Sequence, residues 1–344
     1  MLRRPCAAVL TAGLILAGGQ TSPIVRGRDV TFVAAGDPAD PPRIVADFNG
    51  WAGGDMTPSA DGRTYTLTVT LDPAARVEYL VAYRNRFVLD AGNPRTVPAP
   101  AGPPRSELRM PEYRQPAEPF APAHPGSIDE VRVNGRGIGS RRVRVYVPAT
   151  GSRDAPVLYV HDGGIFMDAL DLPGMVDSLV DRGLISPPVV VFVDANDRHD
   201  DYEPGSAFRS AFVDEIVPAI ERRYGTARGR RAMLGLSRSA VGALDACANG
   251  GISFDACALV APAVASTYFA RVLPPAGSTT RVVIAAGTYD VPLVDDARAL
   301  RDTLRARRVP VEYSESPDGH NHTAFRARLP DVIRALFSLG APAR

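Results

Sequence analysis

The chain has 344 residues, of which 45% are hydrophobic and 22% are charged, a composition typical of a globular protein with room for two domains. Its 39 basic and 38 acidic residues nearly cancel, so no overall charge attracts the protein to nucleic acid or to an anionic membrane. Every basic residue is an arginine, which excludes chemistry that needs a lysine amine, such as Schiff-base formation or P-loop phosphate binding.

The beginning of the chain has the pattern of a secretory signal peptide. Arg3 and Arg4 precede the uncharged apolar run Ala7–Ala17, which small residues follow. This run is shorter than the ~20 apolar residues that span a bilayer as a helix. We therefore expect a signal peptide over residues 1–19 and a mature protein that is secreted or periplasmic, without stable membrane insertion. A misassigned start of the chain is the alternative.

Residues 28–111 have the pattern of a small all-β sandwich. Asn-Gly, Gly-Gly and Asp-Gly turns separate runs of β-branched and aromatic residues. These runs are Val30–Val33, Arg43–Ala46, Tyr65–Thr70 and Val77–Tyr83. Proline then recurs between Pro94 and Pro125, which resists both helix and sheet. We expect a proline-rich linker over residues 112–126.

Residues 127–344 alternate between apolar runs and amphipathic stretches, which predicts a mostly parallel α/β sheet behind a first hairpin, Val131–Val147. Continuous apolar runs fit strands that are buried on both faces. These runs are Val157–Val160, Val189–Val193, Ala232–Leu236, Ala256–Val260, Val282–Ala286 and the weaker Val309–Tyr313. Helices are expected over Phe208–Tyr224, Ala240–Ala248, Asp295–Arg308 and Ala324–Leu339.

A candidate nucleophile, Ser237, stands where one of these strands meets a helix. In the segment Gly235–Ser239, a tight corner exposes the serine hydroxyl and the helix N-terminus supplies amide donors. The segment departs from the usual nucleophile elbow at Ser239, where a second glycine is common. The alternative interpretation is an ordinary Gly-Ser turn.

A serine hydroxyl needs a base and an orienting acid to become a nucleophile. His320 follows the last strand in a loop that a preceding glycine permits, and His322 is its close rival. Asp290 follows the previous strand, whereas Asp295 and Asp296 fit the start of the next helix, where carboxylates complement the helix dipole. A His-x-His zinc site lacks an obvious third ligand, so we expect no metal.

An oxyanion hole needs two preorganised amide donors. The backbone amide of Arg238 is one candidate. The other comes from the loop His161–Ile165, in which Gly163 and Gly164 are both possible because they let the backbone approach a substrate closely. Such a site works without a metal or an organic cofactor.

Several spaced segments over residues 126–340 together resemble the putative-esterase family of α/β hydrolases, which includes enterochelin esterases and the feruloyl and acetyl-xylan esterases of carbohydrate esterase family one. The segments are His161–Gly164, Val191–Asp194 with Arg198 and Tyr202, Phe212–Pro218 with Tyr224, the serine elbow, and Asp318–His320. The resemblance implies an α/β-hydrolase fold and a serine esterase acting through Ser237, His320 and Asp290. Its expected substrates are small-molecule or polysaccharide-linked carboxylic esters.

Arg238 departs from this family, in which an apolar residue commonly follows the nucleophile. Its cation is expected to favour an acidic or catecholate-rich substrate, and Tyr202 is a second candidate substrate contact. Alternatively, Arg238 points away and pairs with a surface acid. Together with Ser239, it leaves a rival function open: a carbohydrate-binding or scaffold protein with a degenerate, non-catalytic hydrolase domain.

The front domain resembles an immunoglobulin-like, glycogen-binding-type module through Asp47–Trp51, Asn93-Pro94 and related positions. Such a module binds glucan or serves as a structural appendage. Trp51, the single tryptophan, discriminates these roles, and a core or interface role is expected because tryptophan is highly buried on average. Cys247 and Cys257 are expected to be separate buried thiols, with a disulfide as the alternative.

Overall fold

The structure, a computed structural model, describes residues 21–99, 102–116, 122–151 and 154–338. The predicted signal peptide, residues 1–19, lies outside the described residues. The chain divides into two compact units, Met1–Tyr113 and Arg114–Arg344. The division falls within the predicted linker, of which residues 117–121 are also outside the described part.

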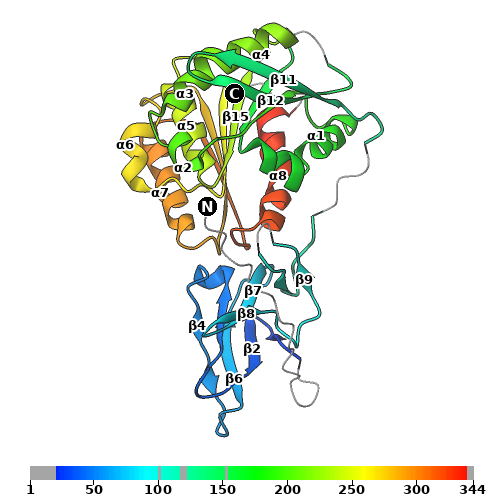
Figure 1. The fold of residues 1–344 in the computed structure, drawn as a ribbon, viewed down its shortest axis with the longest axis vertical. Coiled ribbons are helices and arrows are strands. Elements are labelled where there is room, and N and C mark those ends of the chain that lie inside the picture. The colour runs from blue at the N-terminus through cyan, green and yellow to red at the C-terminus, as the bar shows by residue number, and fades with distance from the viewer. Residues whose placement is uncertain (1–20, 100–101, 117–121, 152–153, 339–344) are drawn as a thin grey trace, which may run out of the picture. The chain divides into compact units, whose positions relative to one another are not determined.

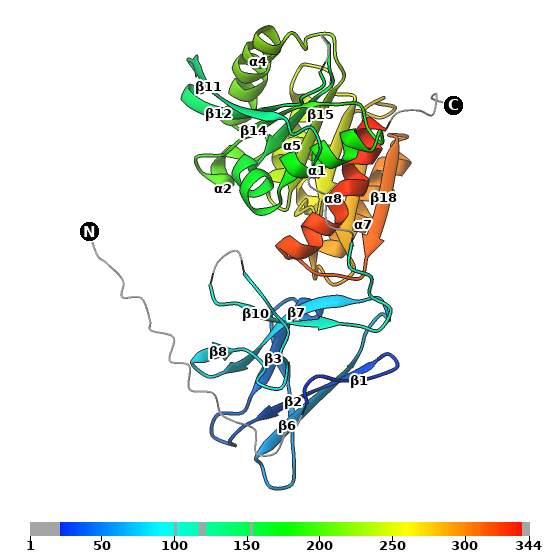
Figure 2. The same cartoon turned by 90° about the vertical axis from the view of Figure 1, so that its right-hand side faces the viewer.

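The N-terminal unit consists of two antiparallel sheets (Figure 2). One sheet has the order β1 (Ile24–Arg26), β2 (Asp29–Ala35), β6 (Thr64–Thr70) and β5 (Thr57–Pro58). The other has the order β4 (Gly54–Asp55), β3 (Arg43–Ala46), β7 (Arg76–Tyr83), β10 (Arg105–Arg109) and β9 (Thr96–Val97), with β8 (Arg86–Val88) paired to β7. Phe32 of the first sheet meets Tyr79 of the second edge-on at 4.8 Å between ring centroids, so the inner faces form the core of a sandwich.

The C-terminal unit is built on one eight-stranded sheet, with the β11–β12 hairpin at one edge and β18 at the other (Figure 2). Its order is β11 (Ser127–Gly135), β12 (Gly139–Val147), β14 (Val189–Val193), β13 (Val157–His161), β15 (Arg231–Leu236), β16 (Ala256–Val260), β17 (Arg281–Gly287) and β18 (Val311–Ser316). The hairpin is antiparallel to its neighbour β14, and the strands from β14 to β18 pair in parallel.

Helices cover both faces of this sheet (Figure 1). Alternate side chains of β13 explain why its sequence is continuously apolar: Tyr159 packs on Phe212 in the apolar layer of one face, whereas Leu158 belongs to the layer of the other face, together with Leu329. On the Leu158 face lie α1 (Leu172–Asp181) and α8 (His322–Phe337). On the Tyr159 face lie α3 (Ala207–Ala211), α4 (Val217–Tyr224), α5 (Ser239–Asn249), α6 (Phe269–Val272) and α7 (Leu293–Ala306).

Parallel strands bring the residues that follow them to a single edge of the sheet. Ser237 follows β15, Asp290 follows β17 and His320 follows β18, so all three lie beyond the carboxyl ends of the strands. The loop after β13, which begins at Asp162, and the short helix α2 (Arg198–Asp201) after β14 reach the same edge.

Candidate active site

The turn around Ser237 is a strained strand-to-helix corner. Ser237 has a φ of 54°, in the left-handed region that non-glycine residues rarely adopt. At Gly235, a Cβ atom would lie 2.5 Å from the carbonyl oxygen of Ser239 and 2.7 Å from Cα of Ala240, so only glycine lets β15 and α5 approach this closely. The hydroxyl of Ser239 accepts from the amide of Leu236 and donates to its carbonyl, both at 2.9 Å. The serine in the place of the second glycine therefore closes the turn.

Ser237, His320 and Asp290 form a continuous hydrogen-bonded series. Nε2 of His320 lies 3.0 Å from Oγ of Ser237. Nδ1 of the same ring lies 2.9 and 3.0 Å from the two carboxylate oxygens of Asp290, which is 2% exposed. The amide of Tyr289 donates to the carbonyl of Asp318 at 3.1 Å, which ties together the two loops that carry the acid and the imidazole. A hydroxyl next to an oriented imidazole can be deprotonated as it attacks a carbonyl.

The rival residues lie elsewhere. His322 is the first residue of α8, and Asp295 and Asp296 stand in the first turn of α7. Asp295 pairs there with Arg298 at 3.1 Å. These positions correspond to the helix-start interpretation of each rival.

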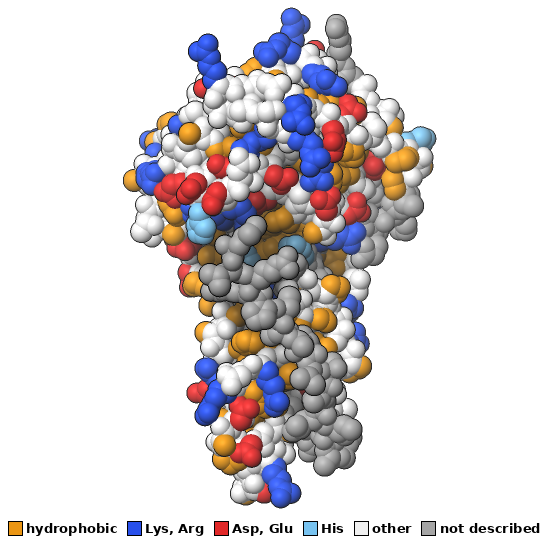
Figure 3. All heavy atoms as spheres, viewed as in Figure 1, with side chains coloured by type: hydrophobic (Ala, Val, Ile, Leu, Met, Phe, Trp, Pro, Cys, Tyr) orange, Lys and Arg blue, Asp and Glu red, His pale blue; other side chains and the backbone are white. Residues whose placement is uncertain are grey.

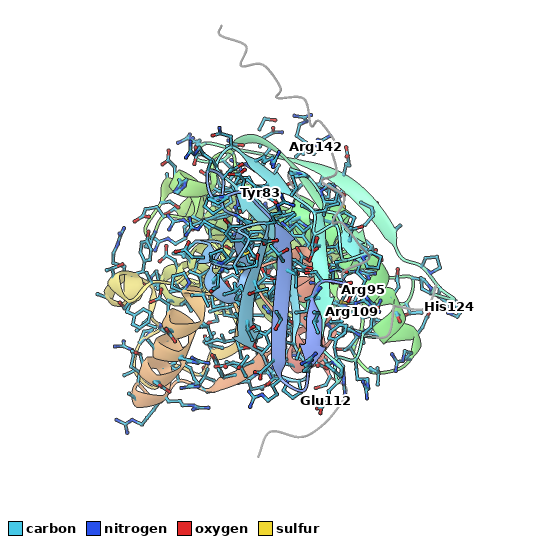
Figure 4. The ribbon with its side chains drawn as sticks, turned by 90° about the horizontal axis from the view of Figure 1, so that it is seen from below. Tyr83, Arg95, Arg109, Glu112, His124 and Arg142 are labelled. Carbon is cyan, nitrogen blue, oxygen red and sulfur yellow. The ribbon has the colours of Figure 1, made fainter. Side chains whose placement is uncertain are left out.

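The remaining histidines belong to other surroundings. His124 projects at the rim of the C-terminal unit (Figure 4), where its ring lies 3.2 Å from Asp181 at the end of α1. His199 is exposed on α2. His161 is fully buried, and its burial lowers the pKa of the ring to about 4. Among the residues that the structure describes, no group of three histidine, cysteine or acidic side chains is arranged to hold a metal ion.

The loop after β13 presents one amide that no described protein group accepts from. The amide of Gly164 donates to Asp194 Oδ1 at 2.7 Å, and the amide of Asp162 donates to the Tyr202 hydroxyl at 2.8 Å. Gly163 lies between them, and a Cβ there would come within 2.6 to 2.8 Å of Phe192 and the amide nitrogen of Val193. Of the two predicted glycines, Gly163 has the amide that stays available to a ligand.

A family model described as Putative esterase matches residues 138–336, more than half of the chain. The chain belongs to this esterase family. The protein is therefore a carboxylic ester hydrolase, and the rival expectation of a non-catalytic carbohydrate-binding or scaffold protein is set aside. The fold is the α/β-hydrolase fold expected from the sequence, and the residues that precede it in the chain form a compatible all-β module.

Solved structures of three esterases share the fold of this esterase. The enterobactin esterase from Shigella flexneri is 20% identical, with a TM-score of 0.66, and the match covers 90% of this chain and 92% of that chain. The ferric enterobactin esterase from Salmonella typhimurium is 18% identical, with a TM-score of 0.66, over 90% of this chain and 93% of that chain. A ferulic acid esterase is 15% identical, with a TM-score of 0.52, over 62% of this chain and 98% of that chain. No curated protein matches the sequence.

The two residues of the esterase that were predicted to contact substrate, Tyr202 and Arg238, both bind other protein groups. Tyr202 is fully buried, with its hydroxyl on the amide of Asp162, so the prediction that it contacts substrate is wrong. The guanidinium of Arg238 donates to the Tyr268 hydroxyl at 2.7 Å and to Glu203 at 2.8 Å. Arg238 thus pairs with an acid, the alternative given above, and its charge is largely neutralised.

Sequence reasoning missed the acidic partners in this region. Burial alone would raise the pKa of Glu203, but hydrogen bonds from Arg238 and Arg271 hold it below its ordinary value. Asp162 accepts a forked pair of bonds from Arg198, and Asp194 accepts from the amide of Gly164 in the loop after β13. Arg198 and Asp194 occur in the segments that carry the family resemblance, but their sequence positions do not show which carboxylate or amide each one meets.

The remaining predictions concern residues outside the active site. Trp51 is partly buried, donates to Asp47 at 3.2 Å and lies under the Arg105 guanidinium at 4.3 Å, which gives it a structural role in the module. Cys247 and Cys257 are buried free thiols.

The surface of the C-terminal unit carries charges of both signs (Figure 3), in agreement with the 39 basic and 38 acidic residues of the sequence. Arginine and carboxylate side chains lie interspersed over the C-terminal unit on the face drawn in Figure 3. No helix in the described part of the chain is both long enough and apolar enough to cross a membrane.

Proposed function

We propose that the esterase cleaves its substrate through an acyl-enzyme formed on Ser237, with His320 as the base and Asp290 as the acid that orients it. The observation that carries this proposal is the series of contacts from Asp290 through His320 to Ser237, with each step at 2.9 to 3.0 Å. The burial of Asp290 keeps its carboxylate away from water, where it best stabilises a neighbouring imidazolium.

The reaction follows from these positions. Oγ of Ser237 attacks the ester carbonyl while Nε2 of His320 takes its proton, and the resulting imidazolium is stabilised by Asp290. The backbone amides of Arg238 and Gly163 donate to the carbonyl oxygen as it becomes negatively charged. His320 then protonates the departing alcohol, and in the second half of the reaction it activates a water molecule that releases the acid.

We further propose that the substrate is a small lactone or ester of the siderophore type rather than a feruloyl or acetyl ester of a polysaccharide. The support is architectural: the enterobactin esterases match 90% of this chain, both units included, whereas the ferulic acid esterase matches 62% of it. Export through the predicted signal peptide would place the reaction outside the cytoplasm.

The mechanism is tested with p-nitrophenyl butyrate and an alkyl fluorophosphonate. Wild type should hydrolyse the ester and carry one phosphonate adduct on Ser237, located by mass spectrometry of its tryptic peptide. Ser237→Ala should lose both the ester hydrolysis and the phosphonate adduct. His320→Ala should lower kcat by at least about 10³-fold. His322→Ala separates the two imidazoles: a loss in this variant that equals the loss in His320→Ala contradicts the proposal.

The substrate proposal is tested with the same pure protein on ferric enterobactin, methyl ferulate and acetylated xylan. The expected order puts the siderophore first in kcat/KM, with no turnover of any of the three by Ser237→Ala. Faster turnover of methyl ferulate would overturn the substrate assignment and leave the mechanism intact.

A further inference from the structure

We propose that Arg198 is a positioning residue for the oxyanion hole: its ion pair with Asp162 holds the loop so that the Gly163 amide faces the reacting carbonyl. The inference rests on the proposed function, since it assumes that the Gly163 amide stabilises the oxyanion. It concerns a pair that makes no contact with the Ser237–His320–Asp290 series.

The backbone at Asp162 needs an external restraint. Its φ is 57°, so the residue lies in the left-handed region, which aspartate visits more readily than most residues but still at a cost. This single residue turns the chain from β13 into the glycine pair. A change in its φ would rotate the following peptide, whose N–H belongs to Gly163.

The restraint comes from a charged fork. Nε of Arg198 lies 2.9 and 3.1 Å from the two oxygens of Asp162, and Nη2 lies 2.6 Å from one of them. Asp162 is 4% exposed, so its carboxylate is shielded from water, and within the described residues Arg198 is the only cation that pairs with it. The planar guanidinium fixes the orientation of the carboxylate as well as its charge.

Two further bonds leave only one amide of the turn for a substrate. The amide before Gly163 is held by Tyr202, and the amide after it is held by Asp194. A Cβ on Gly163 would lie 2.6 Å from Phe192 and 2.8 Å from the amide nitrogen of Val193, so the loop has little room to relax toward β14. Arg198 belongs to α2, outside this loop, and therefore ties the oxyanion loop to a second element.

The expected consequence is a loss of transition-state binding with little loss of substrate binding. Negative charge on the carbonyl oxygen develops only along the reaction, so a misplaced donor lowers kcat and leaves KM almost unchanged. We expect Arg198→Gln to lower kcat about 10- to 100-fold, less than the ~10²–10³-fold caused by deleting an oxyanion donor outright. KM should stay within about twofold.

The matched control is Arg231→Gln. Arg231, the first residue of β15, forms a comparable fork on Glu221, a buried carboxylate of α4, at the opposite end of the strand from Ser237. Each of the two variants removes the guanidinium that pairs with a buried carboxylate. If Arg198 contributes only to stability, the two variants should lower the melting temperature alike and leave kcat alike.

The deciding measurement is the affinity for a trifluoromethyl ketone, which binds to a catalytic serine as a tetrahedral anion. Arg198→Gln should weaken this affinity by the factor by which it lowers kcat/KM, and Arg231→Gln should leave both unchanged. Affinity for an uncharged substrate analogue without a reactive carbonyl should be the same in all three proteins. If Arg198→Gln binds the ketone like wild type, or if the analogue weakens in parallel, the positioning role is wrong.

Two further variants keep the test decisive if Arg198→Gln folds poorly. Arg198→Lys retains the charge without the fork and should fall between wild type and Arg198→Gln in ketone affinity. Asp162→Asn should lower ketone affinity about as much as Arg198→Gln, and the double variant should be no worse than either single one. If the losses of ketone affinity in the two single variants add up in the double variant, Arg198 and Asp162 do not act through one ion pair. Absence of any ketone adduct on Ser237 in wild type would instead overturn the proposed function.

Discussion

At the scale of single residues, Asp290, the acid of the proposed mechanism, is the clearest case of a role set by surroundings. Asp290 and Asp295 are five residues apart, and both are aspartates near the start of α7. Asp290 is 2% exposed and meets the imidazole, whereas the Asp295 side chain is 80% exposed and meets Arg298. Burial and partner, rather than residue type, separate the catalytic role proposed for Asp290 from the helix-dipole role of Asp295.

Asp290→Asn should therefore lower kcat about 10³- to 10⁴-fold, because a neutral amide no longer stabilises the imidazolium and favours the wrong tautomer. KM and the melting temperature should change little. Steady-state kinetics on p-nitrophenyl butyrate give the measurement, and Asp295→Asn is the control that should keep wild-type activity. Equal losses in the two variants would remove Asp290 from the mechanism.

His161 shows the same dependence on surroundings with a consequence for stability. Its ring stacks on Tyr202 at 5.0 Å between centroids and packs against Phe208 and Phe212. Burial disfavours the charged ring and lowers its pKa to about 4 from the ordinary 6.5. Between these two values the unfolded chain binds a proton that the folded protein does not, so this group makes the C-terminal unit less stable as the pH falls.

We expect His161→Phe, which keeps an aromatic ring in the stack, to flatten this dependence. Between pH 6.5 and pH 4, wild type should lose about 3 kcal/mol of unfolding free energy relative to the variant, since one pKa unit corresponds to about 1.4 kcal/mol. Urea unfolding followed by circular dichroism at both pH values measures the difference. Parallel pH profiles for the two proteins would show that the ring is not buried as described.

At the scale of elements, the apolar runs predicted the strands well because helices cover both faces of the sheet. The run Ala256–Val260 coincides with β16, and Val189–Val193 coincides with β14. The helix expected over Phe208–Tyr224 is present but is divided into α3, a π-helical turn over Phe212–Ile216 and α4. A π-helical turn holds about one residue more than an α-helical turn, and here the apolar residues still share one face. The spacing of apolar residues in the sequence therefore does not reveal the π-helical turn.

Helix α1 was missed because its sequence contradicts its structure locally. Pro173 and Gly174 occur in its first turn, and both normally disfavour a helix. There Pro173 lacks only an amide that would be unpaired anyway, and the Asp171 side chain accepts from the amide of Gly174. Tertiary burial of Met175 and its neighbours then outweighs the weak propensity.

Strand order explains which site residues the sequence could predict. Strand order brings the residues after β15, β17 and β18 to one edge, which is why Ser237, Asp290 and His320 could be expected together. Which way a side chain points within a loop does not follow from strand order. Tyr202 was therefore expected to face substrate, whereas its hydroxyl accepts from the amide of Asp162 and so supports the loop after β13.

The close approach of β15 and α5 at the elbow gives a prediction for Gly235. Gly235→Ala places a methyl group 2.5 Å from the carbonyl oxygen of Ser239, so strand and helix must separate. We expect the unfolding free energy to fall by about 1–3 kcal/mol, with a parallel loss of esterase activity because Ser237 moves with the helix. Gly151→Ala, whose new methyl would have its nearest neighbour at 3.7 Å, is the control for thermal unfolding and activity. Wild-type behaviour of Gly235→Ala would contradict the described corner.

At the scale of the whole molecule, each of the two units has a core of its own. The C-terminal unit depends on two apolar layers around a parallel sheet. The small N-terminal unit adds to its sandwich core a charged network, in which the buried Arg76 bridges Glu78 at 3.0 Å and Glu107 at 2.7 Å. A network of this kind stabilises the fold only while all its partners remain in place, which makes this unit sensitive to charge changes.

Asp47 makes that sensitivity measurable. Burial, together with the nearby charge of Glu78, raises the pKa of Asp47 to about 6 from 3.8. The folded unit therefore holds a proton between pH 4 and pH 6 that the unfolded chain releases, so the contribution of Asp47 to stability falls as the pH rises through that window. Asp47→Asn should gain about 3 kcal/mol of unfolding free energy relative to wild type between pH 4 and pH 7.

Trp51, which donates to Asp47 and is the single tryptophan, makes fluorescence specific for the N-terminal unit. Urea unfolding of full-length wild type and Asp47→Asn at the two pH values should show the relative shift in this signal alone. Esterase activity comes from the other unit, so its loss with urea should follow the same curve in both proteins. A fluorescence difference that does not change with pH would mean that Asp47 is ionised at the same pH in the folded and unfolded states. Activity curves that shift together with fluorescence would mean that the two cores unfold as one.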